Sequence, residues 1–129
     1  MADQPKERRI TSEAEAKVTV QRSRFIALVF PAQDLDQIKK VISKLRRKHH
    51  KARHHCWACR LQDQEGRLLE QARDDGEVGR PGMAMLELLR ARGLQGAVVV
   101  TRYFGGVKLG PGGVKRAFVQ AAEEALEGL

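Results

Sequence analysis

The fold is decided by residues 97–118, which read AVVVTRYFGGVKLGPGGVKRAF. Residues 97–103 are rich in β-branched and aromatic side chains and predict a buried strand. Residues 105–113 contain five glycines, which interrupt regular structure and predict a turn. From residue 114 to residue 126, apolar side chains recur at helical spacing. This stretch therefore predicts a strand, a glycine-rich turn and an amphipathic closing helix.

Further strand signals precede this unit. Residues 16–21 alternate apolar and polar side chains, as a half-buried strand does. Residues 25–30 are apolar throughout and stop at a proline, which is typical of a more deeply buried strand. A central strand is predicted at residues 53–61, and a short returning strand at residues 68–71.

Two further helices are predicted between the strands. Asp34 with Gln37 forms a capping-box pattern, and a single apolar stripe follows it. A shorter helix around residues 85–89 is expected to stop at Gly93. Because strands and helices are mixed without a regular βαβ repeat, we predict an α+β fold, a two-layer sandwich with helices on one face of a mixed sheet. The stripe consists of Leu35, Ile38, Val41, Ile42 and Leu45.

Length and composition favour one domain. The chain has 129 residues, of which 42% are hydrophobic and 31% are charged. We expect residues 1–15 to form a polar, frayed N-terminus and residues 16–129 to form a single domain. The longest apolar run, residues 25–32, is far shorter than the roughly 20 residues that span a bilayer. A charged N-terminus and two closely spaced cysteines predict a soluble, unexported protein of the cytoplasm.

The net charge of +8 is concentrated in one segment. Residues 39–60 hold nine basic side chains, no acidic ones and all four histidines. Such a concentration predicts a positive field that faces an anionic partner, with nucleic acid ahead of acidic protein and membrane. The alternative is a solvated helix face that serves solubility. The candidate nucleic-acid-binding residues are Lys40, Lys44, Arg47, Lys51, Arg53 and Arg60.

The glycine-rich segment is a candidate anion site. Glycines let the backbone approach a ligand closely, and the free amides of a helix start attract anions. The segment has neither the lysine and hydroxyl residue of a Walker loop nor the glycine spacing of a dinucleotide site. A phosphate cradle and a tight turn that serves packing alone are equally compatible with it. The candidate residues are Arg102, Gly105, Gly106, Lys108, Gly110, Gly112, Gly113, Lys115 and Arg116.

Two other clusters have chemical potential. Cys56 and Cys59 have the spacing of a zinc knuckle, but residues three apart on a strand point to opposite faces, so we expect no shared metal. The acidic loop, residues 74–77, is compatible with Mg²⁺ binding or with a catalytic base. The simpler alternative is a turn whose carboxylates bond to backbone amides or cap the next helix. The residues of this second cluster are His54, Asp74, Asp75 and Glu77.

The sequence resembles the IMPACT/YigZ family from Arg22 to Leu126. Residues 99–118 are similar to the family's signature almost position for position, and residues 23–26, 52–60 and 74–77 also match. The resemblance implies a fold like the second domain of ribosomal protein S5 and a link to the control of translation initiation. Residues 77–82 depart from the family pattern, because they are one residue shorter and lack its threonine. The resemblance also implies appended domains that we do not expect here.

We therefore favour a non-enzymatic module of this family that binds RNA, the ribosome or a translation factor, without a cofactor or metal. A small enzyme that acts on a phosphorylated ligand is the main alternative, and it would use the acidic loop and His54. A third hypothesis is an adaptor that binds protein without nucleic acid. The first hypothesis requires nucleic-acid binding that is sensitive to salt, and the second requires a saturable pocket for a small ligand. The third requires neither.

Overall fold

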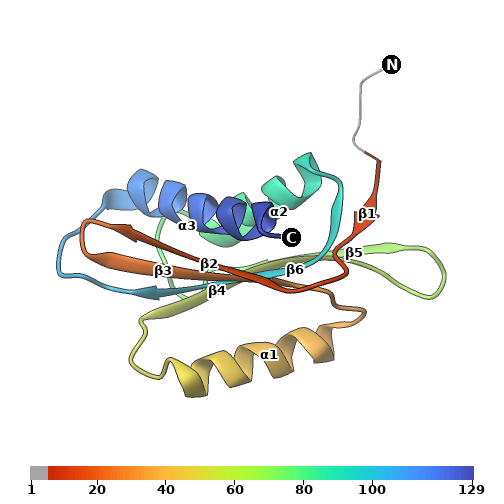
Figure 1. The fold of residues 1–129 in the computed structure, drawn as a ribbon, viewed down its shortest axis with the longest axis horizontal. Helices are drawn as coiled ribbons and strands as arrows, with labels where there is room; N and C mark the ends of the chain where they lie inside the picture. Colours follow the sequence, from red (N-terminus) through yellow and green to blue (C-terminus); the bar gives the residue numbers. More distant parts are fainter. Residues whose placement is uncertain (1–5) are drawn as a thin grey trace.

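A computed structural model describes residues 6–129 and shows a six-stranded sheet with helices above and below it (Figure 1). Five strands follow the order β2-β3-β6-β4-β5, with every neighbouring pair antiparallel, and β1 pairs in parallel with the start of β6. The sheet is therefore mixed, as predicted. The strands are β1 (Arg8–Arg9), β2 (Ala14–Val20), β3 (Ser23–Phe30), β4 (His54–Gln62), β5 (Leu68–Arg73) and β6 (Leu94–Tyr103). The helices are α1 (Leu35–Lys48), α2 (Pro81–Ala91) and α3 (Gly110–Glu127).

The helices cover both faces of the sheet, so the expectation of helices on one face is wrong. Helix α1 lies on one face, whereas α2 and α3 lie side by side on the other (Figure 1). The central strands β4 and β6 bury their side chains on both sides, and each side contributes to a separate apolar cluster. An apolar side chain at every position is what a strand needs when both faces are covered. The result is three layers rather than two.

The larger cluster lies between the sheet and the α2–α3 pair. It includes Phe25, whose ring meets that of Phe118 edge-to-face at a centroid distance of 5.1 Å, together with Met85 and Leu89. The smaller cluster fixes α1 through Ile38 and its neighbours on β4 and β6. Fully burying one such side chain stabilises the fold by about 1.5–3 kcal/mol. Both layers are therefore held by apolar contact with the sheet, where α1 packs on β4 and β6, α2 packs mainly on β4, and α3 packs mainly on β2 and β3.

The predicted element types agree with the structure, including the cap of α1. The Asp34 carboxylate accepts a hydrogen bond from the Gln37 amide at 2.9 Å, as the capping-box pattern predicted. The boundary expected after residue 15 does not coincide with the described elements. Strand β1 lies within residues 1–15, and Ile10 is buried at the Gly96 position of β6. Residues 1–5 lie outside the described residues.

One end of the sheet gathers segments that are distant in sequence, and we call it the glycine-loop end. It comprises residues 21–24 of the β2–β3 turn, residues 49–54 after α1, the acidic loop with its continuation to residue 80, and residues 102–113. Strand pairing brings them together, because Arg102 lies opposite both Phe25 on β3 and His54 on β4. The Gly105 amide also donates to the Ser23 hydroxyl at 3.1 Å. Most of the candidate site residues lie at this end or on the adjacent helix α1.

Candidate nucleic-acid and anion interface

The basic side of α1 forms a ridge of exposed cations, Lys40, Lys44 and Arg47. These three side chains border a shallow hollow, together with Lys39 and the acidic Asp36. The opposite side of the helix is buried in the smaller apolar cluster. Because burial of one side fixes the rotation of the helix, the ridge is held toward solvent.

The remaining predicted cations divide into two groups. Helix α1 ends at Lys48, so Lys51 lies in the following turn rather than on the ridge, and it is exposed there. Arg53 is also exposed, and its guanidinium carbon lies 4.7 Å from the centre of the Phe104 ring. Arg60 requires a correction, because it is 6% exposed and its guanidinium pairs with Glu7 and Glu70, each at 2.9 Å. The charge of Arg60 is therefore neutralised by carboxylates of the same chain.

The glycines between β6 and α3 serve different purposes. A Cβ at Gly105 would lie 2.2 Å from the Arg22 carbonyl carbon, so this glycine permits close packing of two backbone segments. Gly106 and Gly110 have φ of 90° and 72°, and a Cβ at either would meet nothing within 4 Å. Their requirement is conformational, since positive φ is costly for other residues. The turn therefore contains a glycine that serves packing, as the tight-turn hypothesis requires. It also contains open backbone at Gly106 and Gly110, as the phosphate-cradle hypothesis requires.

The start of α3 carries cations but no side-chain cap. Lys108 and Arg116 border a shallow hollow of about 380 Å³ that also includes Gly113. The Arg116 guanidinium folds over the first turn, since a Cβ at Gly112 would stand 3.3 Å from its Nη1 atom. Lys115 is exposed on the same turn. The structure thus brings these candidate anion-binding residues together at one helix start, where the helix dipole adds a partial positive charge.

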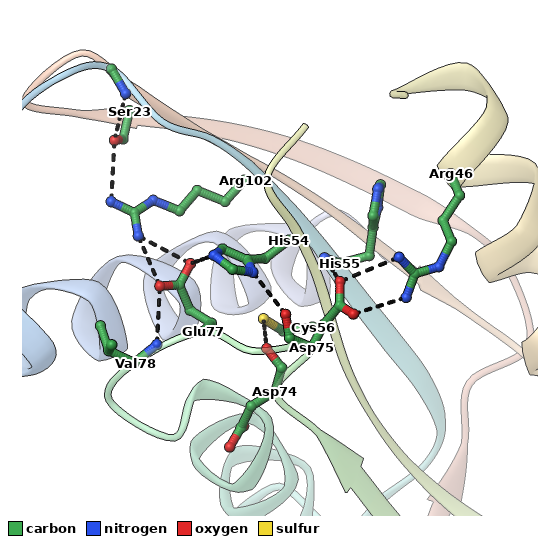
Figure 2. A network of polar contacts seen from close by, with 11 residues as sticks. Ser23, Arg46, His54, His55, Cys56, Asp74, Asp75, Glu77, Val78 and Arg102 are labelled. Atoms are coloured by element: carbon green, nitrogen blue, oxygen red, sulfur yellow. Dashed lines mark hydrogen bonds and ion pairs between the residues drawn. The ribbon is translucent and has the colours of Figure 1, made fainter. Parts of the chain in front are cut away.

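Arg102 is the second correction, because it is not free to bind an anion. The residue is 5% exposed, and its Nη1 atom lies 3.0 Å from both carboxylate oxygens of Glu77 (Figure 2). Its Nη2 atom lies 3.5 Å from the Ser23 hydroxyl, and its Nε atom has no hydrogen-bond partner among the described residues. Arg102 therefore ties the acidic loop to the sheet.

The three carboxylates of the acidic loop are all engaged within the protein, and Figure 2 shows the contacts of the Asp75 and Glu77 carboxylates. Asp74 accepts from the Gly82 amide at 2.8 Å, near the start of α2, where Arg80 offers no side-chain cap. Asp75 accepts from the His55 amide at 2.8 Å and receives both Nη atoms of Arg46, at 3.1 and 3.3 Å. Burial opposes ionisation of Asp75, but the bonds from Arg46 and His55 outweigh it and hold the pKa of this carboxyl below its ordinary value.

The histidines and cysteines near this loop do not form a nucleophilic pair. His54 donates from Nδ1 to the Asp75 carbonyl at 2.7 Å, and its Nε2 atom lies 3.6 Å from Glu77. His55 faces the other layer, where Nδ1 lies 2.9 Å from the Thr101 hydroxyl. Burial raises the pKa of the Cys56 thiol, which donates to the Asp74 carbonyl. Cys56 and Cys59 belong to opposite apolar clusters, as the strand spacing predicted. Residues 6–129 contain no group of three or more His, Cys, Asp or Glu placed to hold a metal ion.

The family resemblance is confirmed by comparison with known proteins. The sequence profile of the Impact N-terminal domain matches residues 21–126. This chain belongs to the IMPACT family. The IMPACT family member YvyE of Bacillus subtilis (strain 168) is 35% identical to it over 119 residues, which are 91% of this chain and 54% of that relative.

Two solved structures resemble this IMPACT-family chain. One, described as a crystal structure of a hypothetical protein, has a TM-score of 0.77 and 30% identity, and the match covers 90% of this chain and 57% of the other. The other is the two-domain translational regulator Yih1, with a TM-score of 0.60 and 27% identity, where the match covers 98% of this chain and 50% of the other. The IMPACT-family chain spans about half the length of the curated relatives that it matches first. No helix within residues 6–129 is long and apolar enough to cross a membrane.

Sequence reasoning missed the contacts of two aromatic residues, Tyr103 and Phe104, at the glycine-loop end of the IMPACT-family chain. The Arg24 guanidinium lies over the Tyr103 ring at 4.5 Å, and the Tyr103 hydroxyl lies 2.7 Å from His49 Nδ1. Phe104, on which Arg53 stacks, is 38% exposed. A signal was present, since two consecutive aromatic residues, Tyr103 and Phe104, stand where β6 ends. Its significance depended on which arginines approach, and these come from other elements.

Proposed function

We propose that this chain is a cytoplasmic, non-enzymatic module that binds RNA in the context of translation. The observation that carries the proposal is the set of exposed cations on the α1 ridge and the adjoining turn. None of these residues forms an ion pair with any other residue in the part of the chain that the structure describes. The residues are Lys40, Lys44, Arg47, Lys51 and Arg53.

Cations in this state suit phosphate binding for a physical reason. A lysine or arginine already paired with a carboxylate must break that pair before it contacts a phosphate, whereas an unpaired one only releases water and counterions. The ridge is also rigidly placed, because the other side of α1 is buried. Contacts of this kind position a nucleic acid through its backbone and carry no base sequence information.

The translational context comes from the relatives. Yih1 is described as a two-domain translational regulator, and this chain aligns with half of it. RNA is the dominant anion of the translation machinery, so a basic face is compatible with that context. A ribosomal surface or an acidic translation factor would present the same charge, and the experiment below distinguishes RNA from protein.

The alternative enzyme hypothesis has less support from the geometry. It needs Asp74, Asp75 and Glu77 to be available to a metal or a substrate, together with His54. Each of these carboxylates instead accepts hydrogen bonds from backbone amides or arginines of the same chain. Their arrangement supports the simpler sequence interpretation, in which the loop bonds to amides and caps a helix.

The test is RNA binding measured at increasing salt concentration. Replacing Lys40, Lys44 and Arg47 by glutamine is expected to flatten the slope of log affinity against log salt by about 2, since each phosphate contact on a single strand contributes about 0.7. The matched control replaces three exposed cations on β1 and β2, namely Arg8, Arg9 and Lys17, by glutamine and so removes the same charge.

The control slope should stay close to that of the wild-type protein. Equal slopes in both variants would assign the ridge to solubility. A pull-down from lysate in which the captured proteins are unaffected by RNase would instead support the adaptor hypothesis.

A further inference from the structure

A series of aromatic rings and guanidinium groups runs from the larger apolar cluster to the surface at the glycine-loop end. Phe25, which is fully buried, lies 5.5 Å from the guanidinium carbon of Arg102. The same carbon lies 5.6 Å from the Phe104 ring, and the Arg53 guanidinium carbon lies 4.7 Å from that ring. Exposure increases along the series, from Phe25 through Arg102 at 5% to Phe104 at 38%. The last two members, Arg53 and Phe104, face solvent.

The outer pair is held in place by contacts that do not involve solvent. Arg102 supports the Phe104 ring and is itself fixed by both oxygens of Glu77. The Arg53 amide donates to the Arg102 carbonyl at 2.9 Å, which places its backbone beside the ring. Phe104 is also the one aromatic residue among the exposed large apolar side chains of residues 6–129. A preorganised planar pair binds with a smaller entropic cost than a flexible one.

The chemistry of this pair fits one kind of ligand. Guanidinium planes and aromatic rings are the two side-chain surfaces on which unpaired nucleobases stack in RNA complexes. In a duplex the base faces are already stacked on each other, so only a single strand offers a free face. Lys51 and Lys108 are exposed on the adjoining turns and supply charge for the neighbouring phosphates.

On the basis of the RNA binding proposed above, we infer that Arg53 and Phe104 form a stacking site for an unpaired nucleobase and that the chain selects single-stranded over duplex RNA. The inference names the form of RNA, which the α1 ridge by itself does not distinguish. An acidic protein partner would need the charge of Arg53 but not its plane.

The central experiment separates plane from charge with the full chain. Arg53→Lys keeps the positive charge and removes the planar group, so binding of a labelled twelve-nucleotide oligo(U) should weaken about five- to tenfold with an unchanged salt slope. Arg8→Lys is the matched control, since Arg8 is an exposed cation on β1, outside the ridge, with no aromatic neighbour among the described contacts. The control should bind within about twofold of the wild-type protein.

A second pair of variants tests the ring. Phe104→Leu should weaken oligo(U) binding by at least the same factor, whereas Phe104→Tyr should retain it. Phe104→Trp adds a direct readout, because stacking of a base should quench the new indole fluorescence. The wild-type protein is the baseline, as its single tryptophan, Trp57, is 7% exposed and belongs to the smaller apolar cluster. Circular dichroism verifies that each variant is folded.

The outcomes separate the two proposals. Failure of the wild-type protein to bind any RNA would overturn the proposed function and this inference with it. Binding of oligo(U) and of a twelve-base-pair duplex with equal affinity, or equal affinities for Arg53→Lys and Arg8→Lys, would overturn the stacking site and leave RNA binding intact. An unquenched Phe104→Trp signal at saturating oligo(U) would do the same.

Discussion

Arg53 and Arg60 are seven positions apart in one basic stretch, but they lie at opposite ends of the sheet. Within residues 6–129, only Arg60 of the two is paired with carboxylates. At the end where β4 turns into β5, Arg60 pairs with Glu7 and Glu70, and Arg90 also pairs with Glu70. At the glycine-loop end, Arg53 rests on an aromatic ring and has no carboxylate partner among the described residues. Availability for a ligand is therefore decided by tertiary neighbours and not by the local density of charge.

The largest difference between the two ends should appear in stability. Arg60→Ala is expected to lower the free energy of unfolding by about 2 kcal/mol, because it removes a buried guanidinium and its charge-assisted bonds to Glu7 and Glu70, whose side chains are 44% and 22% exposed. Arg53→Ala should change it by no more than about 0.5 kcal/mol, as expected for a surface site. Urea unfolding measures both. The contrast would fail if Arg60→Ala left stability unchanged while it weakened RNA binding, since Arg60 would then belong to the interface.

A smaller effect is expected at the start of α3. Arg116→Ala should weaken binding of RNA or phosphate about tenfold and leave the fold intact, because a charge-assisted contact contributes on the order of 1.5–3 kcal/mol. Arg92→Ala is a suitable control, since Arg92 pairs with Glu123 at 3.4 Å at the other end of the helix. Calorimetric titration measures the affinities. Equal binding by both variants would leave the glycines of residues 105–113 with a packing role only.

The smallest effect concerns acid, and it compares one carboxylate from each end. Bonds from Arg90, opposed by burial, lower the pKa of Glu70 from its ordinary 4.5, and the pKa of Asp75 is likewise below its ordinary 3.8. A depressed native pKa contributes stability that is present above the unfolded value and is lost as the pH falls through the native value. The wild-type protein should therefore lose stability below about pH 4.5, the onset set by Glu70.

Two variants assign this loss to its sources. Asp75→Asn and Glu70→Gln should each be less stable than the wild-type protein at pH 7 and should show a shallower decrease on acidification. Glu70→Gln should change the curve from the higher pH onward. Urea unfolding midpoints between pH 7 and about pH 2 provide the curves. Parallel curves for wild-type and variant proteins would show that the carboxylate has the same pKa in both states.

The sequence was sufficient for every described element except β1, and it was insufficient for the layers. Alternation, apolar runs and the Asp34 cap depend on neighbours within a few residues, and these predictions agree with the structure. The face on which α1 packs depends on whether the central strands have one or two covered faces. The apolar character of residues 25–30 and 97–100 contained that information, because such strands bury both sides. The two-layer prediction did not use it.

The predicted site was limited by the same lack of tertiary information. Arg60 and Arg102 are residues of a type that binds anionic ligands, so the sequence made them candidates. Their guanidinium groups are instead occupied by Glu7, Glu70 and Glu77, which come from other parts of the chain. The exposed cations of α1 were predictable, since helical periodicity alone places them opposite the apolar stripe. The pairing of Arg53 with Phe104 was not, because the two residues meet only when β4 aligns with β6.

Asp75 joins the layers on either side of the sheet. Its loop contacts Arg102 and His54 through Glu77 on the side of α2 and α3, and its own carboxylate holds Arg46 of α1 on the other side. Helix α1 is thus joined to the acidic loop at a point outside the strands, and it cannot separate from the sheet without breaking the contact between Arg46 and Asp75. The His55 amide also donates to the Asp75 carboxylate, so it would exchange its hydrogen with solvent only when the contacts of this carboxylate break. We therefore expect the two layers to open together rather than one at a time.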